Sequence, residues 1–479
     1  MNGKNRGAGR LPSGRSDDGR DEMSFTEESV RPAEAEGRGG SPLSFWKKLA
    51  AGGAALLLCA LCFFGGWLAK GASEPYEARV ARWMLETMEK YSLYEPEMGR
   101  EDWDEALYRM GAAAIQYGIC EQGERFAAIY RPSERQELLQ SFQGVSQGYG
   151  LYLAQTEHEG QIVPYVSKVL GATPVAEAVS LAGGENGLHR YDRPVRLRYE
   201  RDGQTEEADL SSASLEQIKA AFALVGNSMT LTVDRPVQTE RGVVYTGGNL
   251  LEFSLTARAY TPCYAEYYTS AEIPALPADA ALIALQSFNA PAASDFARCM
   301  EKFAQEGKRH LILDLRDNGG GLVAQAESIL EHLLDTGNSG GTAFAKEVDK
   351  NGKEKYYRTS ANYYGRYGFK SVQVLANGGT ASASELTLMA MQEFGSVDRV
   401  IGTRTYGKGI VQKYYSMDSG FTLKLTVAQI YDMNGRTIHG FEEGGILPDV
   451  AVEDGIFLDF AHDASLTCAI EALHTGAFS

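Results

Sequence analysis

Two short stretches of the sequence carry residue types that could catalyse attack on a carbonyl carbon. In "GGTASASEL" (378–386), Ser382 stands among small residues where a strand should give way to a helix. In "RTYGKGIVQK" (404–413), Lys408 stands among glycines and apolar residues, with Gln412 four positions later. Burial lowers the pKa of a lysine from about 10.4, so that it can lose its proton and then deprotonate a serine. The two stretches together predict a serine nucleophile and a lysine base.

The lysine stretch also matches a phosphate-binding loop, because Gly402 opens the spacing Gly-x-x-x-x-Gly-Lys. Such a loop needs Ser or Thr directly after the lysine to hold magnesium, and a helix whose N-terminus meets the phosphates. Here Gly409 follows Lys408, and residues 410–417 have the pattern of a strand. Both requirements fail, so we interpret Lys408 as a base and not as a phosphate ligand.

Ser382 also has a purely structural interpretation. With Glu385 it forms Ser-x-x-Glu, the capping box that satisfies the first amides of a helix. The same helix N-terminus leaves backbone N–H groups free and favours negative charge. The amide of Ala383, with that of Gly319 or Gly320 in a second turn, would then form an oxyanion hole for a tetrahedral intermediate.

The other residues with useful chemistry are scattered. His310 opens an expected buried strand and His439 follows a turn, so we interpret both as structural. No Cys-x-x-Cys pair occurs after residue 70, and we expect neither a metal nor a cofactor. Four cysteines follow residue 70: Cys120, Cys263, Cys299 and Cys468. They could form disulfides if this part of the protein is exported, but the sequence does not choose a pairing.

The elements that should position these residues alternate between strand and helix. Aliphatic runs predict strands at 310–316, 371–379 and 397–404, and alternation predicts another at 421–431. Helical periodicity predicts helices at 322–335 and 383–394. Strands alternating with helices indicate an α/β fold with a mixed, largely parallel sheet.

Five stretches occur in one order along this region: "LILDLRDNGGG", "GGTASASELTLMAMQEFG", "IGTRTYGKGIVQ", "LTVAQIYDMNGRTIHG" and "GGILPDV". In order and spacing they resemble the carboxyl-terminal processing, or tail-specific, serine protease family over roughly residues 255–450. The resemblance implies Ser382 as nucleophile, Lys408 as general base and Gln412 as the residue that orients the lysine. One departure is a serine-to-lysine interval one residue longer, which we place in the helix–strand loop at 395–398.

The resemblance extends to a degenerate PDZ-like α+β module over residues 136–238. Residues Gly148, Tyr149, Gly150 and Leu151 resemble the loop that binds a peptide's terminal carboxylate, and residues 214–226 resemble the helix of the peptide groove. The Gly-Asp turn usual in this module is missing. A catalytic domain is expected over residues 239–479, and a helical segment over residues 75–135.

The N-terminal region predicts a membrane anchor. Residues 1–44 have no apolar periodicity and are expected to form a disordered cytoplasmic tail. Residues 45–70 are expected to form a single transmembrane helix, because the uncharged run from Leu49 to Ala69 is long enough for a bilayer core of about 30 Å. Lys47 and Lys48 place the N-terminus in the cytoplasm by the positive-inside rule. A cleaved signal peptide is the alternative, but the length and late start of the run favour a retained span.

The sequence therefore predicts a membrane-anchored serine endopeptidase with a Ser–Lys dyad, which hydrolyses exported proteins or peptides near their C-termini. The formal net charge of −17 does not suit nucleic acid as a partner. The oligomeric state is left open, and an oligomer is compatible with the sequence. Two alternatives remain: a catalytically inactive peptide-binding protein of the same fold, and a non-proteolytic enzyme with a similar oxyanion hole.

Overall fold

The computed structural model describes residues 100–118, 124–158, 161–239, 242–337, 341–416, 420–440, 444–453, 455 and 457–475. Among them, residues 133–413 and 426–475 form one compact unit, and residues 100–132 with 414–425 form a second. The expected tail and transmembrane helix (1–44 and 45–70) lie outside the described residues. None of the helices described is both long enough and apolar enough to span a membrane.

The second unit is small. It contains helix α3 (Arg100–Gly118) and strand β1 (Ala128–Tyr130), which pairs antiparallel with residues 422–424 at the start of strand β20 (Thr422–Tyr431). The Arg131 guanidinium forms an ion pair with Glu105 of α3 at 2.8 Å. The helical segment expected at 75–135 is therefore described only from Arg100 onward.

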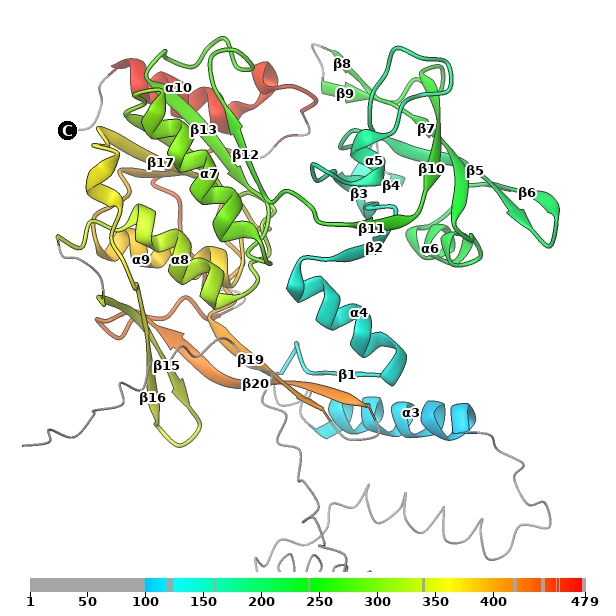
Figure 1. Ribbon diagram of the computed structural model, residues 1–479, viewed down its shortest axis with the longest axis horizontal. Helices are drawn as coiled ribbons and strands as arrows, with labels where there is room; N and C mark the ends of the chain where they lie inside the picture. The colour runs from blue at the N-terminus through cyan, green and yellow to red at the C-terminus, as the bar shows by residue number, and fades with distance from the viewer. Residues whose placement is uncertain are drawn as a thin grey trace, which may run out of the picture. The chain divides into compact units, whose positions relative to one another are not determined.

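The first unit is built around a six-stranded sheet (Figure 1). Its strands in spatial order are β12 (Ala265–Tyr268), β13 (Ala280–Leu285), β14 (His310–Asp314), β17 (Ser371–Ala376), β18 (Arg399–Gly402) and β21 (Val450–Ala451). Strand β12 is antiparallel to β13, and every later pair is parallel. The expected mixed, largely parallel sheet is confirmed.

Both faces of this sheet are covered by helices, as the aliphatic strands require. On one face, Ile283, Leu313 and Val374 pack in a core with helices α7 (Ala292–Gln305), α8 (Val323–Leu333) and α9 (Ala383–Glu393). On the other face, Leu282 and Leu375 pack with Leu466 and other residues of α10 (Ala464–Thr475). The period-two alternation of strand side chains accounts for the division between these two cores.

Further strands lie beside this core. Strand β15 (Ala343–Asp349) pairs antiparallel with β16 (Glu354–Arg358) and with residues 428–431 of β20. Strand β19 (Ile410–Ser416) pairs with β20. Two short 3-10 helices, η2 (Tyr364–Arg366) and η3 (Phe460–His462), and helix α4 (Pro132–Gln143) complete the elements outside the β-rich module.

The β-rich module contains a four-stranded antiparallel sheet in the order β10-β7-β5-β6. These strands are β10 (Leu250–Thr256), β7 (Ser228–Asp234), β5 (Arg193–Arg201) and β6 (Gln204–Asp209). Three two-stranded pairs accompany them: β3 (Tyr152–His158) with β4 (Gln161–Lys168), β8 (Val237–Thr239) with β9 (Gly242–Val244), and β2 (Ser146–Gly148) with β11 (Arg258–Tyr260). Helices α5 (Pro174–Glu177) and α6 (Leu215–Ala223) pack on its core. Strand β10 lies beyond residue 238, where we had placed the end of the module.

The parallel strands determine where a site can form. Strands β14, β17 and β18 run in the same direction, so the loops that follow them (315–322, 377–382 and 403–409) leave the same edge of the sheet. Binding sites of open α/β sheets lie in the crevice at the carboxyl ends of the strands. Ser382, Lys408 and the glycines at 319–320 all occur in or directly after these loops.

Candidate active site

Ser382 occupies a strained turn between β17 and α9. Its φ of 59° and ψ of −115° lie in a region that a residue with a side chain rarely adopts. The residue is half-buried, whereas Ala383 and Ser384 beside it are buried. A strand, a sharp turn and a helix in this order present a serine hydroxyl at the edge of a sheet, as in the nucleophile elbows of other hydrolases.

The buried carboxylate of Glu385 connects Ser382 to the loop that carries Lys408. One oxygen, Oε2, accepts hydrogen bonds from the amides of Ser382 at 2.9 Å and Lys408 at 2.8 Å. The other, Oε1, accepts from Thr405 Oγ1 at 2.6 Å and from the Gly407 amide at 2.7 Å. Because two amides share one oxygen, the backbone nitrogens of Ser382 and Lys408 lie no more than about 6 Å apart.

Sequence reasoning included Glu385 only as a helix cap. The bond from its carboxylate to the Ser382 amide is that cap, but the same carboxylate holds three further donors from residues 405–408. Its side chain is 0 % exposed, so a purely local cap does not describe it. The signal available in the sequence was an acidic residue in the first turn of a mostly apolar helix, because a carboxylate buried there needs partners beyond its own helix.

The turn at residues 318–320 lies directly against Ser382. A Cβ placed on Gly320 would lie 2.7 Å from the Ala383 nitrogen and 2.9 Å from the Ser382 Cβ, so a side chain cannot be accommodated there. The carbonyl of Asn318 accepts from the Ala381 amide at 3.0 Å and holds the two turns together. A third contact, from Ser384 Oγ at 2.8 Å, reaches that carbonyl from α9.

Two backbone amides beside Ser382 remain available as oxyanion donors. The Gly320 amide already donates to Asn318 Oδ1 at 3.0 Å, which makes Gly319 the better of the two expected donors from this turn. Gly319 is exposed, and the described part of the chain offers no acceptor to its amide. Ala383 is the first residue of α9, where an amide has no partner inside the helix.

The loop of Lys408 is shaped by close backbone packing. Gly407 has a φ of 89°, and a Cβ there would lie 2.5 Å from the Gly440 carbonyl oxygen. Thr405 Oγ1 accepts from the Ile446 amide at 2.7 Å, which braces the loop from the C-terminal side. Lys408 and Gln412 are both half-buried, and Gln412 lies in β19. The left-handed bend of this loop is therefore at Gly407.

A second constellation of catalytic residue types lies at the opposite edge of the same sheet. His310 Nδ1 lies 2.7 Å from Ser371 Oγ, and His310 Nε2 lies 3.6 Å from Asp279 Oδ2. Ser371 is only 2 % exposed and is the first residue of a regular strand, so no substrate reaches its hydroxyl. Burial lowers the pKa of His310. The contacts agree with the structural role that we expected for His310.

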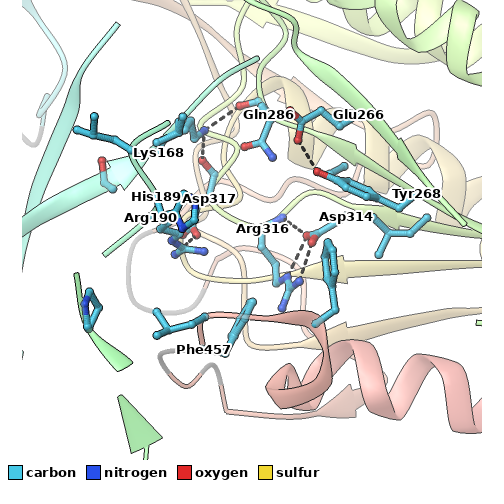
Figure 2. Close-up of a pocket in the computed structure, with 18 of the residues that line it drawn as sticks. Lys168, His189, Arg190, Glu266, Tyr268, Gln286, Asp314, Arg316, Asp317 and Phe457 are labelled. Atoms are coloured by element: carbon cyan, nitrogen blue, oxygen red, sulfur yellow. Dashed lines mark hydrogen bonds and ion pairs between the residues drawn. The ribbon is translucent and has the colours of Figure 1, made fainter. Parts of the chain in front are cut away.

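A cavity of about 470 Å³ lies between β4 of the β-rich module and the carboxyl ends of β13 and β14 (Figure 2). Lys168 Nζ donates to the carbonyls of Gln286 at 2.9 Å and Asp317 at 3.0 Å. The Asp317 carboxylate pairs with Arg190 at 2.7 Å. Asp317 directly precedes the Asn318 turn, so two cations of the module contact the chain next to Gly319. Burial lowers the pKa of Lys168, and the Asp317 charge opposes that shift.

The residues expected to bind a peptide carboxylate occupy a separate part of the module. The Tyr149 hydroxyl donates to the Gly226 carbonyl at 2.6 Å, and its own carbonyl accepts from the Val175 amide. Gly150 has a φ of 75° and packs against Thr173. Leu151 and Tyr149 pack at the margin of the module's core, and Gly148 ends β2. These four residues thus lie close together in the β-rich module. They are far from Ser382 in the sequence.

The part of the chain that the structure describes contains no cluster of His, Cys, Asp or Glu suited to a metal ion.

Comparison with known proteins agrees with this fold. Residues 279–452 match the sequence profile of peptidase family S41. Over 171 residues the chain is 32 % identical to the carboxy-terminal processing protease CtpB of Bacillus subtilis, covering 36 % of this chain and 33 % of that protein. It is 25 % identical over 379 residues to carboxyl-terminal-processing peptidase 3, chloroplastic, of Arabidopsis thaliana, covering 76 % and 66 %.

A solved structure described as a putative S41 protease from Bacteroides fragilis shares the fold. It has a TM-score of 0.54 at 16 % sequence identity, over 81 % of this chain and 99 % of that one. The chain matches only about a third of the length of several curated relatives, including both carboxy-terminal processing proteases of Bacillus subtilis. Residues 279–452 are thus similar to peptidase family S41, a family of serine-type proteases, and the resemblance to carboxyl-terminal processing proteases is confirmed over this region.

Proposed function

We propose that this chain is a serine endopeptidase in which Ser382 attacks the peptide carbonyl and Lys408 is the general base. The observation that supports the proposal most directly is the Glu385 carboxylate oxygen shared by the amides of Ser382 and Lys408. This shared oxygen holds the backbone nitrogens of Ser382 and Lys408 no more than about 6 Å apart. Gln412, four residues beyond Lys408 in β19, is proposed to orient the lysine amine.

The reaction would follow from these positions. Lys408, neutral before attack, takes the proton of the Ser382 hydroxyl as the oxygen adds to the carbonyl carbon. The oxyanion that forms accepts hydrogen bonds from the amides of Ala383 and Gly319, or Gly320 if its bond to Asn318 opens. Lys408 then returns the proton to the leaving amine, and water hydrolyses the acyl-enzyme by the same steps in reverse order.

We also propose that the enzyme acts near the C-termini of exported proteins. The β-rich module would act as a degenerate PDZ domain in which residues 148–151 bind the terminal carboxylate, and helix α6, which packs against β3, forms one wall of the groove. The names of the carboxy-terminal processing relatives support this substrate class. Residues 45–70 would anchor the protein, with the catalytic domain outside the cytoplasm.

A peptidase assay on the purified chain tests the chemistry. The full chain should cleave an unfolded protein substrate, and Ser382→Ala should not, while the circular dichroism of the two proteins should agree. If both bind substrate and neither cleaves it, the chain is an inactive peptide-binding protein. If Ser382→Ala cleaves at the rate of the unchanged chain, the proposed nucleophile is wrong.

The C-terminal preference needs its own test, because an internal endopeptidase would pass the first one. Two peptides of identical sequence, one ending in a carboxylate and one in an amide, should differ in KM with the free acid bound more tightly. Equal KM values would remove the carboxylate-binding role of residues 148–151 and leave the Ser–Lys chemistry intact. The peptide pair is preferable to Gly150→Asp, since a Cβ at Gly150 would lie 2.6 Å from Thr173 and disturb the fold.

A further inference from the structure

Two cysteine thiols in the first unit converge on one backbone oxygen. Cys263 Sγ donates to the Ala265 carbonyl at 3.3 Å, and Cys299 Sγ donates to the same carbonyl at 3.6 Å. Each sulfur is therefore within hydrogen-bonding distance of one atom, and the two sulfurs lie no more than about 7 Å apart. The catalytic mechanism uses neither thiol.

The backbone around the two cysteines is held in place from several directions. The Cys263 amide donates to the Gly171 carbonyl at 3.0 Å, and the Tyr264 amide donates to Asp295 Oδ2 at 2.8 Å. Asp295 and Cys299 are four residues apart on α7, so they occupy the same face of that helix. This face of α7 therefore lies against residues 264 and 265, where the Asp295 carboxylate and the Cys299 thiol both contact the backbone.

From this geometry we propose that Cys263 and Cys299 form a disulfide bond when the protein meets an oxidising environment. Rotation of the two side chains away from the Ala265 carbonyl, which both thiols now contact, would bring the sulfurs toward the bonding distance of about 2.05 Å. The step oxidises both thiols: two S–H bonds break, one S–S bond forms, and two protons and two electrons pass to the oxidant. A disulfide such as oxidised glutathione is the oxidant, and it is reduced to two thiols.

The bond would form slowly without help. Burial raises the pKa of Cys263, and burial raises that of Cys299 to about 12. Since the thiolate is the attacking species, the rate of closure should increase with pH. Cys263 is the more accessible of the two and would be the first to react with an external disulfide, after which Cys299 would displace the leaving thiol.

The position of the bond gives it a mechanical role. Residues 261–264 connect β11 to β12. Strand β11 pairs with β2 of the β-rich module, and β12 belongs to the six-stranded sheet. Helix α7 belongs to the catalytic core. A bond from Cys263 to Cys299 would fasten this connecting segment to the core and limit the movement available to the module.

Mass spectrometry of the full chain tests the proposal. Incubation with oxidised glutathione at pH 8, followed by alkylation and digestion with trypsin without reduction, should join residues 259–298 to residues 299–302. Trypsin cuts after Arg258, Arg298 and Lys302, so the two fragments part when a reductant is added. Cys468→Ser should leave this product unchanged, because Cys468 lies on α10 against the other face of the sheet. Cys263→Ser should abolish it.

Two results would overturn the proposal. One is full alkylation of Cys263 and Cys299 after equilibration with the oxidant. The other is a stable mixed disulfide between glutathione and Cys263. Its persistence would mean that the Cys299 thiolate cannot reach the Cys263 sulfur to displace glutathione. Cys263→Ser replaces a half-buried residue and should fold; if it does not, the count of alkylated cysteines in the unchanged chain still decides the question.

Discussion

Two serines stand at opposite ends of the same strand of the parallel sheet, and each has catalytic residue types nearby. Ser371, at the start of β17, contacts His310, which lies near Asp279. Ser382, in the turn after β17, shares the Glu385 carboxylate with the Lys408 loop. By residue type alone the first group looks more like a catalytic triad. Access, backbone strain and available amides favour the second group as the proposed active site.

The difference teaches that the backbone selects the nucleophile. Ser371 has the extended conformation of a regular strand and is 2 % exposed. Ser382 has a positive φ, precedes the amide of Ala383 at a helix N-terminus, and faces a turn whose Gly319 amide is exposed. A tetrahedral oxyanion needs donors already directed at it, and among the described residues the amides of Gly319 and Ala383 at the carboxyl edge of this sheet are suited to that role.

The largest expected effect is at Ser382 itself. Ser382→Ala should reduce kcat by at least about 10³-fold, because it removes the attacking oxygen. Ser371→Ala is the matched control at the other end of the strand and should stay within about twofold of the unchanged chain. Loss of activity in both variants, with both folded, would contradict the assignment of the carboxyl edge.

Lys408→Arg should be as inactive as Lys408→Ala. A guanidinium stays protonated at any pH that the fold tolerates, so it cannot accept the serine proton. Peptidase rates measured from pH 6 to 10 would show no recovery in either variant. An active Lys408→Arg protein would make the residue a fixed positive charge and would exclude the Ser–Lys mechanism.

Glu385→Gln should lower kcat by about 10²-fold with little change in KM. The amide keeps the shape of the side chain but replaces one acceptor oxygen with a donor, so it cannot satisfy all four of its present donors, and the Lys408 loop should shift relative to Ser382. Glu393, at the other end of α9, accepts a hydrogen bond from the Met433 amide. The control variant Glu393→Gln should retain activity. If Glu385→Gln keeps its kcat, the shared carboxylate does not position the site.

Lys168→Met should have a moderate effect, about tenfold on kcat. Methionine retains the apolar stem but loses the ammonium that donates to the carbonyls of Gln286 and Asp317 beside the Gly319 turn. Lys370 is an exposed lysine in an ion pair with Asp279, and Lys370→Met is the control variant. Equal activity of the Lys168 and Lys370 variants would show that the module's contact does not affect the oxyanion turn.

The smallest expected effect concerns stability. It involves His310, at the amino end of strand β14. Burial lowers the pKa of His310, with Lys370 and Arg309 adding to the shift and Asp279 opposing it. The unfolded chain, whose histidines have pKa values near 6.5, then binds a proton that the folded chain resists. Stability should therefore fall as the pH falls below about 6.5, and urea denaturation of His310→Gln should show a weaker dependence. An equal slope in both proteins would remove His310 from the titration.

Much of the catalytic core could be predicted from the sequence because its patterns are local. The strands expected at 310–316 and 371–379 are present as β14 and β17, each two or three residues shorter, and the residues after Ser382 are a helix, as expected. The role of Glu385 could not be predicted in full, since its partners at Thr405 and Gly407 are some twenty residues away in the sequence. Pairings at long range depend on packing that no local pattern encodes.

The bend in the Lys408 loop shows the same limit on a smaller scale. By position in the sequence, a bend between the lysine and Gln412 would fall at Gly409, but the positive φ next to the lysine is at Gly407. Gly409 is needed for another reason: a Cβ there would lie 2.8 Å from the His439 nitrogen. Only the position of residues 438–440, distant in sequence, distinguishes a glycine that bends from one that packs closely.

The bracing of the Lys408 loop has a consequence for the life of the newly made chain. Thr405 exchanges hydrogen bonds with Ile446, so the loop is held by residues close to the C-terminal end of the catalytic sheet. A ribosome makes Ser382 well before Ile446, and during that interval the proposed nucleophile has no braced base. The order of synthesis would thus keep a growing chain from cutting itself or its neighbours until residue 446 has been made and has folded against the loop.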